Sequence, residues 1–165
     1  MGSDEKPVPV VRLELKHLNL KELVEIDELL AQAPLFHAAG PQGMARLVEK
    51  AIPRRLAAGQ AIFRQGDAGA SVFMVIRGEV TLGHEAAVVA TVHSGDFFGE
   101  AEALTPKSLR GYTAAAVGSA DVAEFPAEEI ALLVKKEVAV LALLRDARDA
   151  RARANSELDD FLNRW

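Results

Sequence analysis

Two carboxylates and one arginine lie close together in a glycine-rich stretch, GDFFGEAEALTPKSLRGYTAAA, at residues 95–116. Glu100 follows Gly99 directly, Glu102 lies two positions later, and Arg110 follows after a segment long enough for a short helix. A helix that begins near Gly99 directs its first backbone N–H groups outward, where they attract anions. An arginine binds phosphate through two parallel hydrogen bonds, and a carboxylate accepts a hydroxyl proton. These residues therefore predict a site for a sugar phosphate.

Other kinds of chemistry find little support in the sequence. The 165 residues include no cysteine, so disulfides, thiolate nucleophiles and thiolate metal ligands are excluded. No nucleophile motif or P-loop is present. Glu100 and Glu102 are two positions apart, which places them on different faces of a helix and argues against a catalytic pair. The four histidines lack metal-ligand spacing: His17, His37, His84 and His93. We therefore expect no enzyme, no catalytic residue and no metal.

The overall charge and the N-terminal segment limit the partners and the location of the protein. The net charge is −5, which disfavours nonspecific binding to nucleic acid because such binding requires a basic surface. No apolar run of 18 residues is present, so we expect no membrane span. The first residues, MGSDEKPVPVV, lack the basic and apolar regions of a signal peptide. We expect a cytoplasmic protein.

Short apolar runs alternate with glycine-containing turns between residues 53 and 125, which is typical of a β barrel or sandwich. Helical periodicity appears on both sides of this region. It predicts a helix at 19–33 that ends at Pro34, and a second helix at about 41–51 with Pro41 in its first turn. The predicted parts are an N-terminal extension, an N-terminal helical subdomain, the β barrel and a C-terminal helical subdomain, at residues 1–18, 19–52, 53–125 and 126–165.

The order AAGQAIFRQGDAGASVFMVIRGEV, GDFFGEAEAL, arginine and TAAA resembles the cyclic-nucleotide-binding domain family. The family includes catabolite-activator-type regulators, regulatory subunits of cyclic-nucleotide-dependent kinases, and gated channels. The resemblance covers roughly residues 34–145. It implies a mainly β fold, an eight-stranded jelly roll with N-terminal helices and a long C-terminal helix. The segment 95–116 would contain the phosphate-binding cassette.

The resemblance also implies roles for individual residues. Gly99 and the following backbone amides would meet the cyclic phosphate, Glu100 would accept a hydrogen bond from the ribose 2′-hydroxyl, and Arg110 would bind the phosphate. The implied ligand is cAMP or cGMP, and no other cofactor is expected. The full set of expected ligand contacts is Phe98, Gly99, Glu100, Ala101, Glu102, Arg110, Gly111 and Tyr112.

Three features depart from the family pattern, of which the absence of a proline near KKEVAV in the helix after the barrel is the minor one. Gly111 stands where a serine or threonine often follows the arginine, which favours cAMP over cGMP, although Thr113 is a partial substitute. Glu102 stands at a position that is usually small and brings a negative charge to a phosphate site. Two unit charges 4 Å apart repel by about 4 kcal/mol at an effective dielectric constant of 20. Glu102 thus has three outcomes: it repels the ligand, it pairs with Arg110 so that the pocket prefers a neutral nucleoside or stays empty, or it points to solvent.

The C-terminal segment has two parts with different patterns. The run RDARDARARA at 145–154 predicts a solvated helix with ion pairs between neighbouring turns, rather than a nucleic-acid-binding arm. Apolar residues then return at helical spacing and predict either packing, on the N-terminal helices or in a homodimer, or a lid over the ligand. In the lid interpretation Trp165 caps the bound base. The apolar residues are Leu158, Phe161, Leu162 and Trp165.

Together these features predict a sensor that binds a cyclic purine nucleotide without chemical change. Ligand binding would pull the C-terminal helix toward the barrel, and a protein effector would respond. Two alternatives stay open. One is a domain of the same fold that has lost nucleotide binding and serves as an interaction or oligomerisation module, with Glu100 and Arg110 in internal ion pairs. The other is a cupin-like enzyme, which requires a cluster of metal ligands on the strands.

Overall fold

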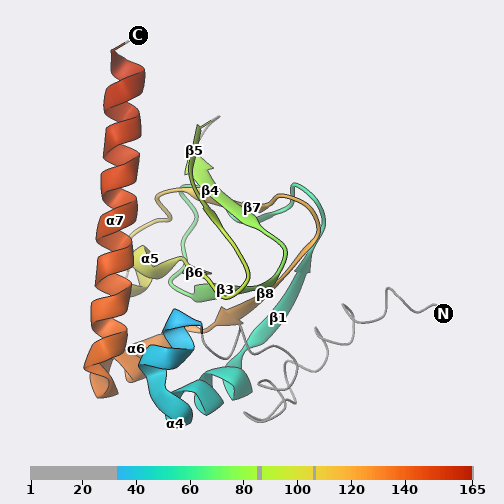
Figure 1. Ribbon diagram of the computed structural model, residues 1–165, viewed down its shortest axis with the longest axis vertical. Helices are drawn as coiled ribbons and strands as arrows, with labels where there is room; N and C mark the ends of the chain where they lie inside the picture. The colour runs from blue at the N-terminus through green and yellow to red at the C-terminus, as the bar shows by residue number, and fades with distance from the viewer. Residues whose placement is uncertain (1–32, 85–86, 106, 165) are drawn as a thin grey trace, which may run out of the picture.

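The computed structural model describes residues 33–84, 87–105 and 107–164, and its centre is a barrel of two antiparallel sheets (Figure 1). One sheet has the strand order β1-β8-β3-β6 and the other β2-β7-β4-β5. The strands are β1 Ile52–Leu56, β2 Ala61–Phe63, β3 Val72–Arg77, β4 Val80–His84, β5 Ala87–Val92, β6 Phe97–Phe98, β7 Thr113–Ala116 and β8 Ala120–Phe125. This architecture confirms the mainly β fold with eight strands in a jelly roll.

Two apolar clusters lie on opposite faces of the first sheet, because side chains alternate between the faces of a strand. On β3, Phe73 and Val75 belong to the cluster between the two sheets, whereas Met74 and Ile76 belong to the cluster beneath the helices. All five residues Val72–Ile76 are buried, as expected for a central strand covered on both faces. The barrel and the helices therefore share one sheet as their common support.

The first described helix has two segments joined at a kink. Helix α4, Pro34–Lys50, begins with Pro34 in its first turn, and Gly40 interrupts it with a left-handed φ of 76° just before Pro41. The segment that follows Gly40 agrees with the helix predicted at about 41–51, whereas the segment before Gly40 was not predicted; glycine tolerates the positive φ that forms the kink between them. Pro34 begins a helix here. The helix predicted at 19–33 lies outside the described residues.

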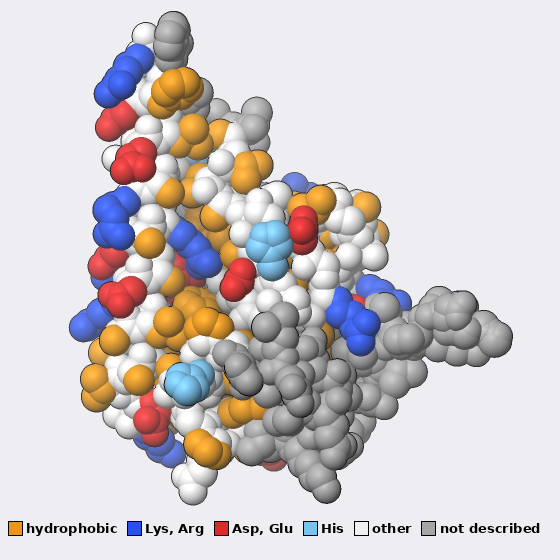
Figure 2. Space-filling view, in the orientation of Figure 1, with side chains coloured by type: hydrophobic (Ala, Val, Ile, Leu, Met, Phe, Trp, Pro, Cys, Tyr) orange, Lys and Arg blue, Asp and Glu red, His pale blue; other side chains and the backbone are white. Residues whose placement is uncertain are grey.

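Three further helices complete the fold: α5 Glu100–Leu104, α6 Ala127–Lys136 and α7 Val138–Asn163. The C-terminal region is divided at Glu137, whose backbone is extended. Helix α7 runs beside the barrel, contacts α5 and β5, and extends beyond them at its C-terminal end (Figure 1). Acidic and basic side chains alternate along its outward face (Figure 2). Among the described helices, none combines the length and apolar character that a bilayer crossing demands.

Candidate ligand-binding site

A cavity of about 160 Å³ lies between the cassette, β5 and α7. Five of the eight expected contact residues line it: Glu100, Ala101, Glu102, Gly111 and Tyr112. The other lining residues come from β5 and from one face of α7: Val89, Arg148, Arg151, Ala152 and Asn155. The cavity is thus walled on one side by the predicted cassette and on the other by the C-terminal helix α7, through residues of that helix that the sequence did not assign to the site.

Gly99 sets the path of the cassette. Its φ is 87°, which suits glycine, and a Cβ atom at this position would lie 2.9 Å from the Ser71 carbonyl oxygen and 3.1 Å from an Arg110 nitrogen. The glycine therefore allows the backbone to approach the guanidinium closely. Helix α5 begins at the next residue, so Glu100 and Glu102 are carried on its first turn.

Arg110 is fixed by both its backbone and its side chain. Its backbone N–H donates to Asp67 O at 2.8 Å, and its carbonyl accepts from Gly66 N–H at 2.8 Å. The guanidinium donates from Nη1 to Gly99 O at 3.0 Å and from Nη2 to Ser71 O at 2.9 Å. The residue is 3% exposed, so these bonds leave it inside the protein rather than at the cavity wall.

Glu102 supplies the charge partner of Arg110. Nη1 of Arg110 donates to Oε1 of Glu102 at 2.6 Å, and both side chains are buried. The guanidinium also lies over the Phe63 ring, with 4.2 Å between its central carbon and the ring centroid. Of the three outcomes open to Glu102, the structure shows the pairing with Arg110. Phosphate would have to compete with this carboxylate for the guanidinium.

Glu100 is fully buried and is bound by α7. Arg151 donates from Nη1 to Oε1 of Glu100 at 2.6 Å and from Nη2 to the Phe97 carbonyl oxygen at 2.9 Å. The second carboxylate oxygen, Oε2, has no hydrogen-bond partner in the described structure. Burial raises the pKa of Glu100, and the nearby Glu102 charge adds to the rise, while Arg151 opposes it. Glu100 therefore lines the cavity and keeps one buried carboxylate oxygen without a hydrogen-bond partner.

The interpretation of residues 145–154 as a simply solvated helix was incomplete. Arg151 has a side chain that is 19% exposed and reaches across to the cassette. The sequence carries a signal for this contact, because Leu144, Arg148, Arg151, Asn155 and Leu158 recur at alternating steps of four and three. Leu144 is fully buried, so the same helical face continues from the core to the cavity.

The remaining expected contacts have mixed placements. Tyr112 packs on Phe63, with ring centroids 5.9 Å apart, and burial raises the pKa of its hydroxyl, which lies 3.4 Å from the Gly99 nitrogen. Phe98 is fully buried between the sheets. Trp165 lies outside the described residues. As ligand contacts, all these residues remain predictions.

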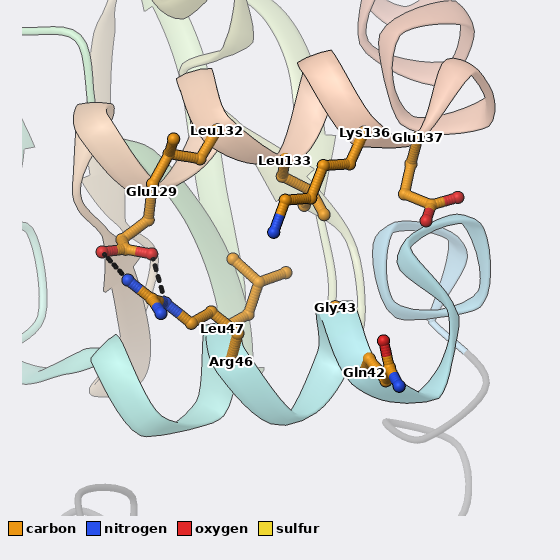
Figure 3. Close-up of a pocket in the computed structure, with 9 residues that line it drawn as sticks. All are labelled: Gln42, Gly43, Arg46, Leu47, Glu129, Leu132, Leu133, Lys136 and Glu137. Carbon is orange, nitrogen blue, oxygen red and sulfur yellow. Dashed lines mark hydrogen bonds and ion pairs between the residues drawn. The ribbon is translucent and has the colours of Figure 1, made fainter.

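A second cavity, of about 240 Å³, lies between α4 and α6 and shares no residue with the cassette (Figure 3). Arg46 on α4 and Glu129 on α6 form a two-bond ion pair at one side of it, at 2.8 and 3.2 Å. Leu47 on α4 and Leu133 on α6 line it and point toward each other between the two helices (Figure 3). Its volume exceeds that of the cassette cavity, but it holds no free buried polar atom.

The family model for the cyclic nucleotide-binding domain matches residues 53–137, about half of the chain. The chain belongs to this family. The resemblance seen in the sequence is therefore confirmed, and the chain has the fold of a cyclic-nucleotide-binding regulatory domain.

Individual relatives are similar over parts of their length. A cAMP-dependent protein kinase regulatory subunit of Mycosarcoma maydis is 29% identical over 113 residues, which cover 65% of this chain and 21% of that protein. The structure of cAMP-bound PfPKA-R has a TM-score of 0.73 at 18% identity, over 85% of this chain and 49% of the other. The regulatory subunit of a cAMP-independent protein kinase A from Trypanosoma cruzi, bound to guanosine, has a TM-score of 0.65 at 18% identity, over 79% and 47%. The chain thus spans about half or less of these proteins.

The metal cluster that a cupin-like enzyme requires has no counterpart in the part of the chain that the structure describes. There, no three histidine, aspartate or glutamate side chains gather in a way that would hold a metal ion.

Proposed function

We propose that the chain is a regulatory sensor module that binds a purine ribose ligand between the cassette and α7, and that the position of α7 is its output. One observation carries the proposal: Glu100 is bound by α7 through one oxygen and keeps the other oxygen free beside the cavity. A ribose hydroxyl that donates to Oε2 meets the same carboxylate that holds Arg151. Ligand binding and helix position are thereby coupled through one side chain.

The size of the cavity supports an outward movement of α7 on ligand binding. Ligand pockets usually enclose about 300 Å³ or more, whereas this cavity encloses about 160 Å³. Because α7 already packs against α5 and β5, a purine ligand enlarges the pocket by shifting α7 outward. This direction is opposite to the one expected from the sequence, in which the ligand pulls the helix toward the barrel, and no observation yet separates the two. The shift is limited by the difference in ligand affinity between the two helix positions.

Among cyclic nucleotides, we propose that cAMP binds more tightly than cGMP. Gly111 lines the cavity and offers no hydroxyl. Thr113, the partial substitute, is not among the residues that line the cavity, and its hydroxyl accepts a hydrogen bond from Gln65 N–H at 2.9 Å. One relative is named as a regulatory subunit of a cAMP-dependent kinase, one similar structure carries cAMP, and another carries guanosine. These relatives support a purine ligand and a regulatory rather than an enzymatic role.

Distance measurements between spin labels test the proposal, and the absence of native cysteines makes the labelling clean. Ser119, in the β7–β8 turn, and Ser156, on α7, are exposed and are both changed to cysteine for labelling. We expect the distance distribution to shift on addition of cAMP, adenosine or guanosine, and the shift to follow the binding isotherm measured by calorimetry. Binding without any shift would contradict α7 as the output.

A second candidate function is an interaction or oligomerisation module without a ligand. The Arg110–Glu102 pair favours it, because the charge of the phosphate-binding group is already paired with a carboxylate inside the protein. A homodimer through α7 and a protein effector belong to this candidate. Light scattering over a range of protein concentrations distinguishes it: a ligand-independent dimer that the panel of purines leaves unchanged supports the module, and a ligand-dependent change supports the sensor.

A further inference from the structure

We infer that the pocket selects an uncharged purine ribonucleoside over the corresponding cyclic nucleotide. This inference rests on the proposed function and names the ligand class of the same site. Its basis is the set of polar groups at the cavity, which presents acceptors to a ligand and keeps the positive charges in existing pairs.

The carboxylates reach the cavity, whereas the phosphate-binding arginine does not. Glu100 and Glu102 both line the cavity, but Arg110 lies behind Glu102 and bonds to it at 2.6 Å. Both carboxylates are almost completely buried. An entering phosphate would therefore meet a buried negative charge before it met the guanidinium, in surroundings where water screens the repulsion poorly.

The other two cations of the pocket are paired as well. Arg151 is bound to Glu100, and Arg148 donates from Nε to Asp149 at 3.0 Å. Each arginine that contributes to the site thus has one carboxylate partner. A phosphate has to compete with a buried carboxylate for Arg110 and for Arg151, and Arg148 is held only by an exposed pair with its neighbour. A neutral ligand leaves both buried pairs intact.

The hydrogen-bonding capacity of the two ligands also differs. Glu100 Oε2 is a buried acceptor without a partner. A cyclic phosphodiester has no proton to donate at neutral pH, and its ring ties up the 3′ and 5′ oxygens, which leaves the 2′-hydroxyl as the ribose donor. A nucleoside keeps three hydroxyl donors. A site whose polar groups are carboxylate acceptors can therefore receive more hydrogen bonds from a nucleoside than from a cyclic nucleotide.

Calorimetric titration of the full chain with adenosine and cAMP, and with guanosine and cGMP, tests the inference. We expect at least one nucleoside to bind about tenfold or more tightly than its cyclic nucleotide, the difference that one unfavourable charge contact produces. Replacing adenosine by 2′-deoxyadenosine should weaken binding about tenfold, because Glu100 loses a donor.

Glu102→Gln isolates the charge while keeping the size of the side chain and an oxygen for Arg110. We expect it to strengthen cAMP binding about tenfold to 100-fold and to leave adenosine binding nearly unchanged. Glu102→Ala is the second variant, and circular dichroism verifies that each variant is folded. Glu129→Gln is the matched control, because it breaks an Arg–Glu pair that lies away from the cassette cavity. It should change neither the affinity for cAMP nor the affinity for adenosine.

Four results would overturn the inference, and the last of them would overturn the proposed function as well. If wild type binds cAMP or cGMP more tightly than the nucleosides, the selectivity is wrong and the sensor function stands. If Glu102→Gln strengthens both ligand types equally, the charge of Glu102 does not determine selectivity. If wild type binds no purine but a Glu102 variant binds cAMP, the pocket is closed by its own carboxylate. If the variants also bind nothing, the proposed function itself fails.

Discussion

Two ion pairs of the molecule join an arginine to a glutamate in very different surroundings. One is Arg110–Glu102 in the barrel, and the other is Arg46–Glu129 beside the α4–α6 cavity. The barrel pair has side chains that are 2% and 5% exposed, whereas Arg46 is 54% exposed. The outer pair has the better two-bond geometry (Figure 3). Exposed pairs nevertheless contribute little to stability, since water screens them and holding two long side chains costs entropy.

The barrel pair is different because both ions have lost their hydration. Each charge there depends on its partner, and removal of one leaves the other buried without compensation. The same holds for Glu100, whose charge partner comes from α7. Burial, rather than hydrogen-bond geometry, therefore decides which pairs control the structure and the chemistry of this molecule.

The largest effect is expected from Arg110→Met. This change leaves Glu102 and Glu100 buried with one cation fewer and frees the Gly99 and Ser71 carbonyls. We expect the free energy of unfolding, measured with urea, to fall by about 3–5 kcal/mol. The matched control Arg46→Met should leave the urea midpoint almost unchanged.

The double variant Arg110→Met/Glu102→Gln sharpens this comparison. It removes both charges, so part of the lost stability should return relative to the single variant. Equal destabilisation by the single and double variants would mean that the backbone bonds of Arg110, and not its ion pair, account for the loss.

An intermediate effect is expected from Arg151→Ala, which removes the charge partner of Glu100 and the bond to the Phe97 carbonyl. Loss of charge-assisted hydrogen bonds should lower the free energy of unfolding by about 1–3 kcal/mol. Amide hydrogen exchange should also quicken in α7 beyond residue 145. Arg153→Ala, exposed on the same helix, is the control. Equal exchange in both variants would show that Arg151 does not hold α7 in place.

The sequence predicted the cassette better than it predicted the partners of the cassette. Gly99, Glu100 and Arg110 lie within a dozen residues, so local backbone requirements restrict where their side chains point. Arg151 lies 51 positions from Glu100, and its contact depends on how α7 is rotated against the barrel. Packing of the whole domain sets that rotation, although the helical stripe that begins at Leu144 indicated the face.

The two possible roles of proline explain why the first segment of α4 was not predicted. A proline ends a preceding helix or occupies the first turn of the next one, and local sequence does not separate these cases at Pro34. At Gly40 the positive φ kinks α4, and Pro41 begins the second segment, which the sequence did predict. The strands were easier to predict, because short apolar runs bounded by glycine-containing turns are typical of the strands of a barrel.

The smallest expected effect is the pH dependence of stability. It should have opposite signs for Glu100 in the barrel and for Glu129 beside the α4–α6 cavity. The pKa of Glu100 is raised above its ordinary value of 4.5 by burial, so its contribution to stability is present below that value and is lost as the pH rises through the raised pKa. The hydrogen bond from Arg46 lowers the pKa of Glu129, so its contribution is present above 4.5 and is lost as the pH falls.

Urea unfolding of wild type, Glu100→Gln and Glu129→Gln across acidic to neutral pH measures both contributions. The stability advantage of wild type over Glu100→Gln should shrink as the pH rises, because the folded protein disfavours the buried charged carboxylate. The advantage over Glu129→Gln should shrink as the pH falls. If both stability differences change with pH in the same direction, the attraction of Arg151 outweighs the cost of burial at Glu100. The ionised form of Glu100 would then be favoured in the folded protein, as it is for Glu129.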